Sequence, residues 1–129
     1  MKPWNQEKNA PAPGQFLCPV EGFADGDIRE LTLGMGSKHP FQLFIHRQGG
    51  EFRCFVNRCP HFGIPLNLEP GRLLSSDRLQ FMCSTHYARF NFDDGLCTEG
   101  PCEGDSLERI PLETRDSALY VASSSVEGA

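Results

Sequence analysis

The sequence lacks the features that define several common classes of protein. No apolar run approaches the roughly 18 residues that a membrane-spanning helix needs. Residues 1–14 lack the apolar stretch and small-residue cleavage site of a secretory signal. The formal net charge is −5, and a general nucleic-acid binder would carry a basic stripe instead. We therefore expect a cytoplasmic protein with neither a membrane nor a nucleic acid as its partner.

The sequence also leaves little room for helices and shows no internal repeat. Ten prolines and thirteen glycines punctuate short β-prone segments, and 129 residues suffice for one domain. Strands are expected at 16–20, 28–34, 41–47, 51–57, 79–83, 89–92 and 108–122, the last as a hairpin around Arg115–Asp116–Ser117. The pattern predicts an all-β fold, a small antiparallel sandwich or barrel.

Two short stretches combine cysteine with histidine. The first is "CPHFGIPL" at 59–66, and the second is "CSTH" at 83–86. Cys59 follows the strand-like segment 51–57, and Cys83 ends the strand-like segment 79–83. Both pairs therefore lie in loops that leave strands, and two such loops can hold one metal centre between them.

The spacing of these residues bears on which metal they would hold. Six cysteines could form a disulfide framework, but without a secretion signal metal ligation is the better expectation. Tetrahedral zinc accepts two thiolates and two imidazoles, usually with the cysteines close together and the histidines close together. Here each loop supplies one of each, which suits a two-iron centre. Zinc remains the alternative.

The two stretches, read as "CPHFGIPL" and "CSTHYARFNFDDG", resemble the signature of the Rieske iron–sulfur proteins. The resemblance extends from Phe16 to about Ala122. It implies one [2Fe–2S] cluster whose inner iron is held by two cysteines and whose outer iron is held by two histidines. By position these ligands are Cys59 and Cys83 for the inner iron, and His61 and His86 for the outer iron.

The same resemblance implies a domain organisation. We expect a single Rieske-like domain at 15–123, with a small cluster-binding subdomain at about 57–92. Residues 1–14 and 124–129 are expected to be tails, the first of them flexible. One departure from the family pattern is Tyr87, because the residue after the last ligand is usually glycine in that family.

The residues around the ligands indicate which kind of Rieske protein this is. High-potential members add a disulfide between the loops, at the positions of Ile64 and Thr85 here. They also place serine and tyrosine hydroxyls against the cluster, at the positions of Ala88 and Phe90 here. With fewer hydrogen bonds to sulfur, we predict a low potential, roughly −150 to 0 mV. This is the ferredoxin-like, oxygenase-associated type.

The histidine count favours an electron carrier over an enzyme. Oxygenase catalytic subunits need a second iron held by two histidines and a carboxylate, and only His39 and His46 remain after the cluster ligands. By resemblance, the chain would pass one electron from a reductase to a terminal oxygenase or similar acceptor.

The partner-facing edge of the chain would involve residues near the ligands, namely Arg58, Phe62, Pro65, Tyr87 and Arg89. The alternatives are a nitrite-reductase-type small subunit, which often lacks the ligands, and a zinc-stabilised binding module.

Four cysteines remain outside the predicted cluster. Cys18 and Cys54 are expected to be small core residues. Cys97 and Cys102, in "GLCTEGPCEG", are close enough in sequence to bridge, but we expect free thiols. No histidine or third cysteine lies near them in the sequence to complete a metal site.

Overall fold

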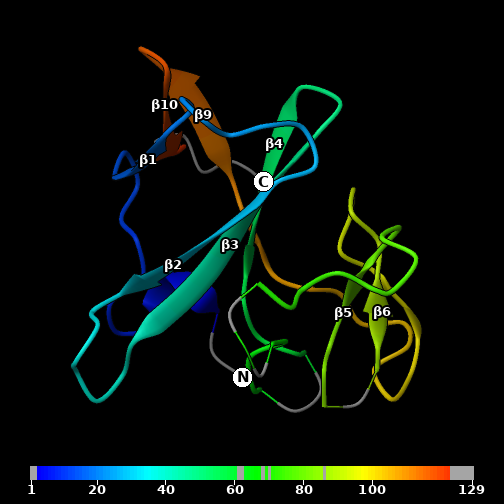
Figure 1. The fold of residues 1–129 in the computed structure, drawn as a ribbon. Helices are drawn as coiled ribbons and strands as arrows, with labels where there is room; N and C mark the ends of the chain where they lie inside the picture. Colours follow the sequence, from blue (N-terminus) through cyan, green and yellow to red (C-terminus); the bar gives the residue numbers. More distant parts are fainter. Residues whose placement is uncertain (1–2, 61–62, 68, 70, 86, 123–129) are drawn as a thin grey trace. The chain divides into compact units, whose positions relative to one another are not determined.

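The regular secondary structure of the chain consists almost entirely of strands, as the computed structural model in Figure 1 shows. The structure describes residues 3–60, 63–67, 69, 71–85 and 87–122. Within these residues the one helical segment is the 3-10 helix η1 (Trp4–Gln6), and no helix is long and apolar enough to span a membrane. The strands are β1 (Phe16–Pro19), β2 (Ile28–Leu33), β3 (Phe41–Gln48), β4 (Glu51–Val56), β5 (Phe81–Met82), β6 (Arg89–Phe90), β7 (Cys97–Glu99), β8 (Arg109–Ile110), β9 (Leu112–Arg115) and β10 (Ala118–Val121). The predicted all-β fold is confirmed.

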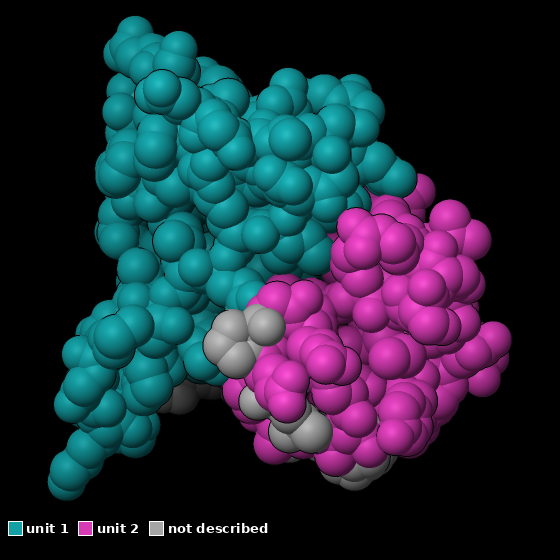
Figure 2. Space-filling view, viewed as in Figure 1, with its two compact units in different colours: residues 1–54, 110–129 teal, residues 55–109 magenta. Residues whose placement is uncertain are grey.

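The chain divides into two compact units, coloured separately in Figure 2. Unit 1 contains residues 1–54 and 110–129, and unit 2 contains residues 55–109. The cluster-binding subdomain predicted at about 57–92 falls within unit 2. The limits of that subdomain and of the whole domain at 15–123 stay predictions.

The strands of unit 1 belong to two sheets, with strand orders β1-β10-β9 and β2-β3-β4-β8, and β4 and β8 each continue into unit 2. The predicted hairpin at the end of the chain is present, because β9 and β10 pair antiparallel with Arg115 opposite Ala118. Its two turn residues, Asp116 and Ser117, have left-handed backbones with φ of 50° and 61°. Such turns match the twist of the flanking strands and fix the register of the hairpin.

Strand β3 supplies much of the core of unit 1. Leu43 and Ile45 are fully buried, as their alternation predicts, but Phe44 between them is equally buried. A strand covered on one face would leave alternate residues exposed. Side chains on both faces of β3 are therefore packed.

The segment before β1 contacts the loop between β2 and β3. The Trp4 ring lies 6.3 Å from the Phe41 ring, measured between centroids. The Asn9 amide donates a hydrogen bond to the His39 carbonyl at 2.8 Å. Flexibility of residues 1–14 in solution stays a prediction, and the tail predicted at 124–129 lies outside the described residues.

Unit 2 contains a small antiparallel sheet with the strand order β5-β6-β7. Phe81 pairs with Phe90 across β5 and β6. The Phe81 ring also packs against Phe55 and Phe92, at centroid distances of 5.7 and 4.9 Å. Cys83 follows β5 directly, so it lies at the tip of the β5–β6 hairpin. The aromatic core beneath this hairpin gives the tip a fixed base.

Candidate metal centre

The two predicted thiolate ligands both lie in unit 2 and are fully buried. Cys59 and Cys83 each have 0% of their surface exposed. The predicted imidazole ligands, His61 and His86, lie outside the described residues. The geometry of the site is therefore built from the cysteines and the backbone of the loops that carry them.

The first ligand loop closes on Cys59 through two backbone hydrogen bonds. The Cys59 carbonyl accepts from the Gly63 N–H at 2.8 Å, and the Cys59 N–H donates to the Ile64 carbonyl at 2.7 Å. Gly63 has a φ of 73°, which lies in the left-handed region. The chain thus turns back on the cysteine within five residues.

The second ligand loop closes in the same way. The Cys83 carbonyl accepts from the Tyr87 N–H at 2.7 Å, and the Cys83 N–H donates to the Ala88 carbonyl at 2.9 Å. Tyr87 has a φ of 61°, so the residue four positions after the cysteine is left-handed in both loops. The two loops therefore close on their cysteines through the same pair of backbone hydrogen bonds, although their sequences place the histidine two positions after one cysteine and three after the other.

A hydrogen-bonded chain through the buried Leu66 joins the two loops. The Ser84 N–H donates to the Leu66 carbonyl at 2.7 Å. The Leu66 N–H in turn donates to the side-chain oxygen of Asn57 at 2.8 Å, and the Asn57 amide donates to the Asn67 side-chain oxygen at 2.8 Å. Asn57 is 5% exposed. Asn57 was not predicted as part of the site; its signal in the sequence is a polar side chain that directly follows a β-strand and precedes the first loop.

A turn of unit 2 brings two further thiols to Cys59. We call residues 97–105 the thiol turn. The sulfur atoms of Cys97 and Cys102 are 3.2 Å apart, and each residue is 1% exposed. Cys59 lies near enough to Cys102 to contribute to the raised pKa of the Cys102 thiol. The expectation that no third cysteine lies near this pair holds in the sequence but is wrong in the fold.

The environment of the cysteines affects their ionisation. Burial raises the pKa of the Cys102 thiol, and its hydrogen bond with Cys97 raises it further. In unit 1, burial likewise raises the pKa of Cys54, with a smaller contribution from the neighbouring Cys18. Cys18 and Cys54 are buried at 5% and 0% exposure, so the prediction that both are core residues is confirmed.

The two arginines predicted at the partner-facing edge form ion pairs within unit 2. Arg58 pairs with Glu108. Arg89 pairs with Asp77 at 2.6 Å and donates to the Gln80 side chain at 2.9 Å. These bonds hold the ends of the ligand loops to the rest of the unit. A role in partner binding stays a prediction for both residues.

The other residues of that predicted edge differ in exposure. Tyr87 is 69% exposed, and Pro65 is also exposed. Phe62 lies outside the described residues. Ala88 and Phe90, which replace the hydroxyl residues of high-potential Rieske proteins, are fully buried. No hydroxyl group is therefore available at these two described positions.

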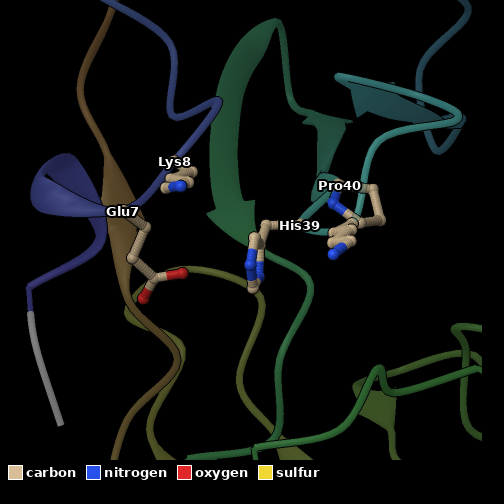
Figure 3. A pocket seen from close by; sticks show the side chains of 5 residues that line it. Glu7, Lys8, His39 and Pro40 are labelled. Atoms are coloured by element: carbon tan, nitrogen blue, oxygen red, sulfur yellow. The ribbon is translucent and has the colours of Figure 1, made fainter.

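The remaining histidines lie in unit 1, apart from the ligand loops in the sequence. His39 lines a cavity of about 560 Å³ together with Glu7, Lys8, Lys38 and Pro40 (Figure 3). His46 is buried in β3, and burial lowers its pKa. Among the described residues, no group of three His, Cys, Asp or Glu side chains is arranged to hold a metal ion.

Comparisons with curated proteins give two kinds of relative. Apoptosis-inducing factor 3 of Homo sapiens is 31% identical over 108 residues, which is 84% of this chain and 16% of that protein. This chain thus spans only a small part of the human relative's length. The ferredoxin component of the p-cumate 2,3-dioxygenase system of Pseudomonas putida is 30% identical over 105 residues, which is 81% of each chain.

Solved structures show the same fold at lower identity. The ferredoxin of carbazole 1,9a-dioxygenase from Nocardioides aromaticivorans IC177 matches with a TM-score of 0.64 and 16% identity, over 86% of this chain and 98% of that one. A chain from the complex of reduced oxygenase and oxidized ferredoxin in carbazole 1,9a-dioxygenase matches with a TM-score of 0.63 and 23% identity, over 84% and 91%. The Rieske-like fold prediction is confirmed.

A family model extends over most of the chain and includes both ligand loops. The model of the Rieske [2Fe-2S] domain matches residues 14–115. The matched region contains all four predicted ligands and the thiol turn. This chain therefore belongs to the Rieske [2Fe–2S] domain family, and its cofactor is a Rieske-type [2Fe–2S] cluster.

Proposed function

We propose that Cys59 and Cys83 hold one iron of the cluster and that His61 and His86 hold the other. The observation that carries this proposal is that both loops close on a fully buried cysteine through the same pair of backbone hydrogen bonds. Buried thiols fit the inner iron, because thiolates are the ligands that iron–sulfur clusters use and burial shields them from oxidants. The bond from Ser84 to Leu66 holds the two loops together, as a shared centre requires.

We further propose that the chain is a one-electron carrier without a catalytic reaction of its own. It would accept an electron from a reductase and deliver it to a terminal oxygenase or a similar acceptor. The support is the p-cumate relative, a ferredoxin component of a dioxygenase system that matches over 81% of both chains. The cluster supplies a single-electron couple, and the protein supplies its ligands and surroundings.

The surroundings favour a low reduction potential. Hydrogen bonds to cluster sulfurs stabilise the reduced form, because reduction adds negative charge. Ala88 and Phe90 supply none at the positions where high-potential members have hydroxyls. We expect a reversible one-electron couple at roughly −150 to 0 mV.

The test of the ligand set is the metal content of the purified chain and of matched variants. We expect two irons and two sulfides per chain, visible absorbance, and an EPR signal on reduction with an average g below that of the free electron. C59A, C83A, H61A and H86A should each lose this signal. C54A and H39A are the controls, because they remove another buried thiol and another histidine and should keep it.

The alternatives predict different results in the same experiment. A colourless chain with one zinc would identify a zinc-stabilised binding module. Retention of iron in C59A or H86A would reject the proposed ligands. A nitrite-reductase-type small subunit is the weaker alternative, because such subunits often lack the ligands and all four are present here.

A further inference from the structure

Unit 1 contains a cavity that takes no part in the proposed function. Its volume is about 560 Å³, and it is lined by Glu7, Lys8, Lys38, His39 and Pro40 (Figure 3). The first two of these residues belong to the N-terminal segment, and the other three belong to the loop between β2 and β3. Small-molecule sites have volumes of roughly 300–1,000 Å³. The cavity is therefore large enough for an organic molecule.

Asn9 joins the two walls of this cavity. Its side-chain amide donates to the Ser37 hydroxyl at 3.1 Å and to the His39 carbonyl at 2.8 Å. These two acceptors flank Lys38 in the sequence, and Asn9 directly follows Lys8. Asn9 has a left-handed backbone with a φ of 64°, which asparagine tolerates better than most residues. One residue thus fixes the backbone on both sides of the cavity.

Packing also holds the N-terminal segment against the loop. A Cβ atom added at Gly34 would lie 2.3 Å from the Asn9 Cγ, so this close approach requires glycine. The Trp4 ring packs against Phe41 at the start of β3, with 6.3 Å between the ring centroids. The two walls of the cavity are therefore held together by side-chain packing as well as by hydrogen bonds.

The charge of the cavity contrasts with the charge of the chain. The formal net charge of the chain is −5, and two of its three lysines, Lys8 and Lys38, line the cavity. Among the described residues neither lysine forms an ion pair, whereas five arginines pair with carboxylates within the protein. Both lysines are exposed, so a ligand can reach them from solvent. Two ammonium groups against the single carboxylate of Glu7 leave the lining positive.

We propose that this cavity binds an organic phosphate monoester, whose phosphate group contacts the Lys8 and Lys38 ammonium groups. At pH 7 a phosphate monoester carries nearly two negative charges on a single group, which two ammonium groups balance. Lysine binds phosphate as a point charge with three donors. This binding function goes beyond electron transfer and does not depend on the cluster ligand set.

The other lining residues suit the organic part of such a ligand. An inorganic phosphate ion would fill only a small part of the cavity. The Glu7 carboxylate repels a second anionic group but accepts hydrogen bonds from hydroxyl groups. Pro40 adds an apolar surface. We therefore expect a ligand with one phosphate group and a hydroxyl-bearing remainder, which is the chemistry of a sugar phosphate.

The test is isothermal titration calorimetry of the full, cluster-loaded chain with three probes. Ribose 5-phosphate represents the proposed class, ribose lacks the charge, and succinate places two charges on separate carboxylates. We expect ribose 5-phosphate to bind, ribose not to bind, and succinate to bind more weakly. Added salt should weaken the binding of ribose 5-phosphate, because it screens exposed charges. No binding of ribose 5-phosphate, or equally tight binding of succinate, would overturn the proposal.

K8A and K38A test the two proposed phosphate contacts. Each should weaken the binding of ribose 5-phosphate by roughly tenfold or more, because each removes a hydrogen bond to a charged group. R72A is the matched control, because Arg72 is an exposed cation of unit 2 and its loss changes the net charge by the same amount. If R72A weakened binding as much as K8A, the overall charge and not the cavity would account for the affinity, and the proposal would fail.

N9G tests the link between the two walls. Glycine adopts the left-handed backbone of Asn9 without strain but cannot donate to Ser37 or His39. We expect N9G to bind ribose 5-phosphate more weakly although it keeps both lysines. Wild-type affinity in N9G would show that Asn9 does not position them.

The outcome is independent of the proposed ligand set. K8A, K38A and N9G should all keep the visible absorbance of the cluster, because none of these positions lies in a ligand loop. Retention of iron in C59A or H86A would reject the cluster ligands and leave the cavity proposal standing. Wild-type affinity for ribose 5-phosphate in both K8A and K38A would reject the cavity proposal and leave the cluster ligands standing.

Discussion

Tyr87 occupies in the second ligand loop the position that Gly63 occupies in the first, and both residues have left-handed backbones. A side chain in this conformation costs roughly 1–2 kcal/mol, which glycine avoids. Because Tyr87 is 69% exposed, few contacts offset that cost. We predict that Y87G raises the free energy of unfolding by about 0.5–1 kcal/mol, after the larger chain entropy of glycine is deducted. Urea unfolding monitored by fluorescence or circular dichroism measures this change.

The control for Y87G is G63A, which adds a side chain at the equivalent position of the first loop instead of removing one. A Cβ atom at Gly63 would meet nothing within 4 Å, so G63A introduces backbone strain without a clash. We expect G63A to lower the free energy of unfolding by about 1 kcal/mol. A clear loss of stability in Y87G would mean instead that the tyrosine ring stabilises the loop.

Asn57 links the end of β4 to the first ligand loop and, through Leu66, to the second. N57A leaves the buried Leu66 N–H without its acceptor, and such a loss costs about 1–3 kcal/mol. We therefore predict lower stability and faster release of iron to a chelator. N67A is the matched control, because it removes a neighbouring amide but leaves the bond between Asn57 and Leu66. If N67A releases iron as fast as N57A, the link through Leu66 is not what holds the loops.

The strands that lead to the site were predictable because their sequences alternate or are rich in β-branched and aromatic residues. Segments 28–34, 41–47 and 51–57 correspond closely to β2, β3 and β4. The β9–β10 hairpin was predictable from its turn residues. Strand β7 was missed, because Cys97–Glu99 has only three residues between glycine-rich turns and no alternation can be recognised in so short a segment.

The contacts around the site were harder to predict, because they join residues that are distant in the sequence. Cys102 seemed isolated when only its sequence neighbours were considered, yet the fold brings it to Cys59. Arg89 was predicted to face a partner protein. It forms an ion pair with Asp77 instead, and β5 separates these two residues in the sequence. Phe55 is fully buried against Phe81, which is distant from it in the sequence. Local patterns do not report such tertiary packing.

The ion pair between Arg89 and Asp77 makes a contribution to stability that depends on pH. Hydrogen bonds from the Ser75 hydroxyl and then from Arg89 lower the pKa of Asp77 from its ordinary 3.8 to about 2. A carboxyl whose pKa is lower in the folded state stabilises the fold above its ordinary pKa. The contribution of Asp77 is therefore full above pH 3.8 and is lost as the pH falls toward 2.

The measurement for Asp77 is the difference in thermal midpoint between the wild-type protein and D77N at a series of pH values. We expect this difference to be constant from pH 7 to about pH 4.5 and to shrink at lower pH. Acid effects on the cluster are common to both proteins and cancel in the difference. S75A removes the hydrogen bond that lowers this pKa most. The difference between S75A and S75A/D77N should therefore be smaller, and it should be fully lost at a higher pH, because the folded-state pKa of Asp77 then lies closer to 3.8. A difference that shrinks already between pH 7 and pH 5 would contradict this assignment.

Gly100 is the point where the thiol turn packs against the second ligand loop. An added Cβ atom would lie 2.8 Å from the Ala88 Cα and 3.0 Å from its Cβ, closer than such atoms normally approach. We predict that G100A costs about 1 kcal/mol for its left-handed backbone and about 1–3 kcal/mol more for overpacking. Because Ala88 accepts the hydrogen bond of the Cys83 N–H, the displaced backbone should also lower the iron content.

Gly104 separates these two contributions. Its φ of 94° resembles the 107° of Gly100, but an added Cβ atom would meet nothing within 4 Å. G104A should therefore show the backbone cost of about 1 kcal/mol with normal iron content. Unfolding free energies and iron per chain, measured for both variants, isolate the contact with Ala88. If G100A and G104A behaved alike, the packing of the thiol turn on the ligand loop would contribute nothing to the site. The difference expected between them arises because Gly100 packs against Ala88 in the loop that carries Cys83, whereas an added Cβ atom at Gly104 would meet nothing within 4 Å.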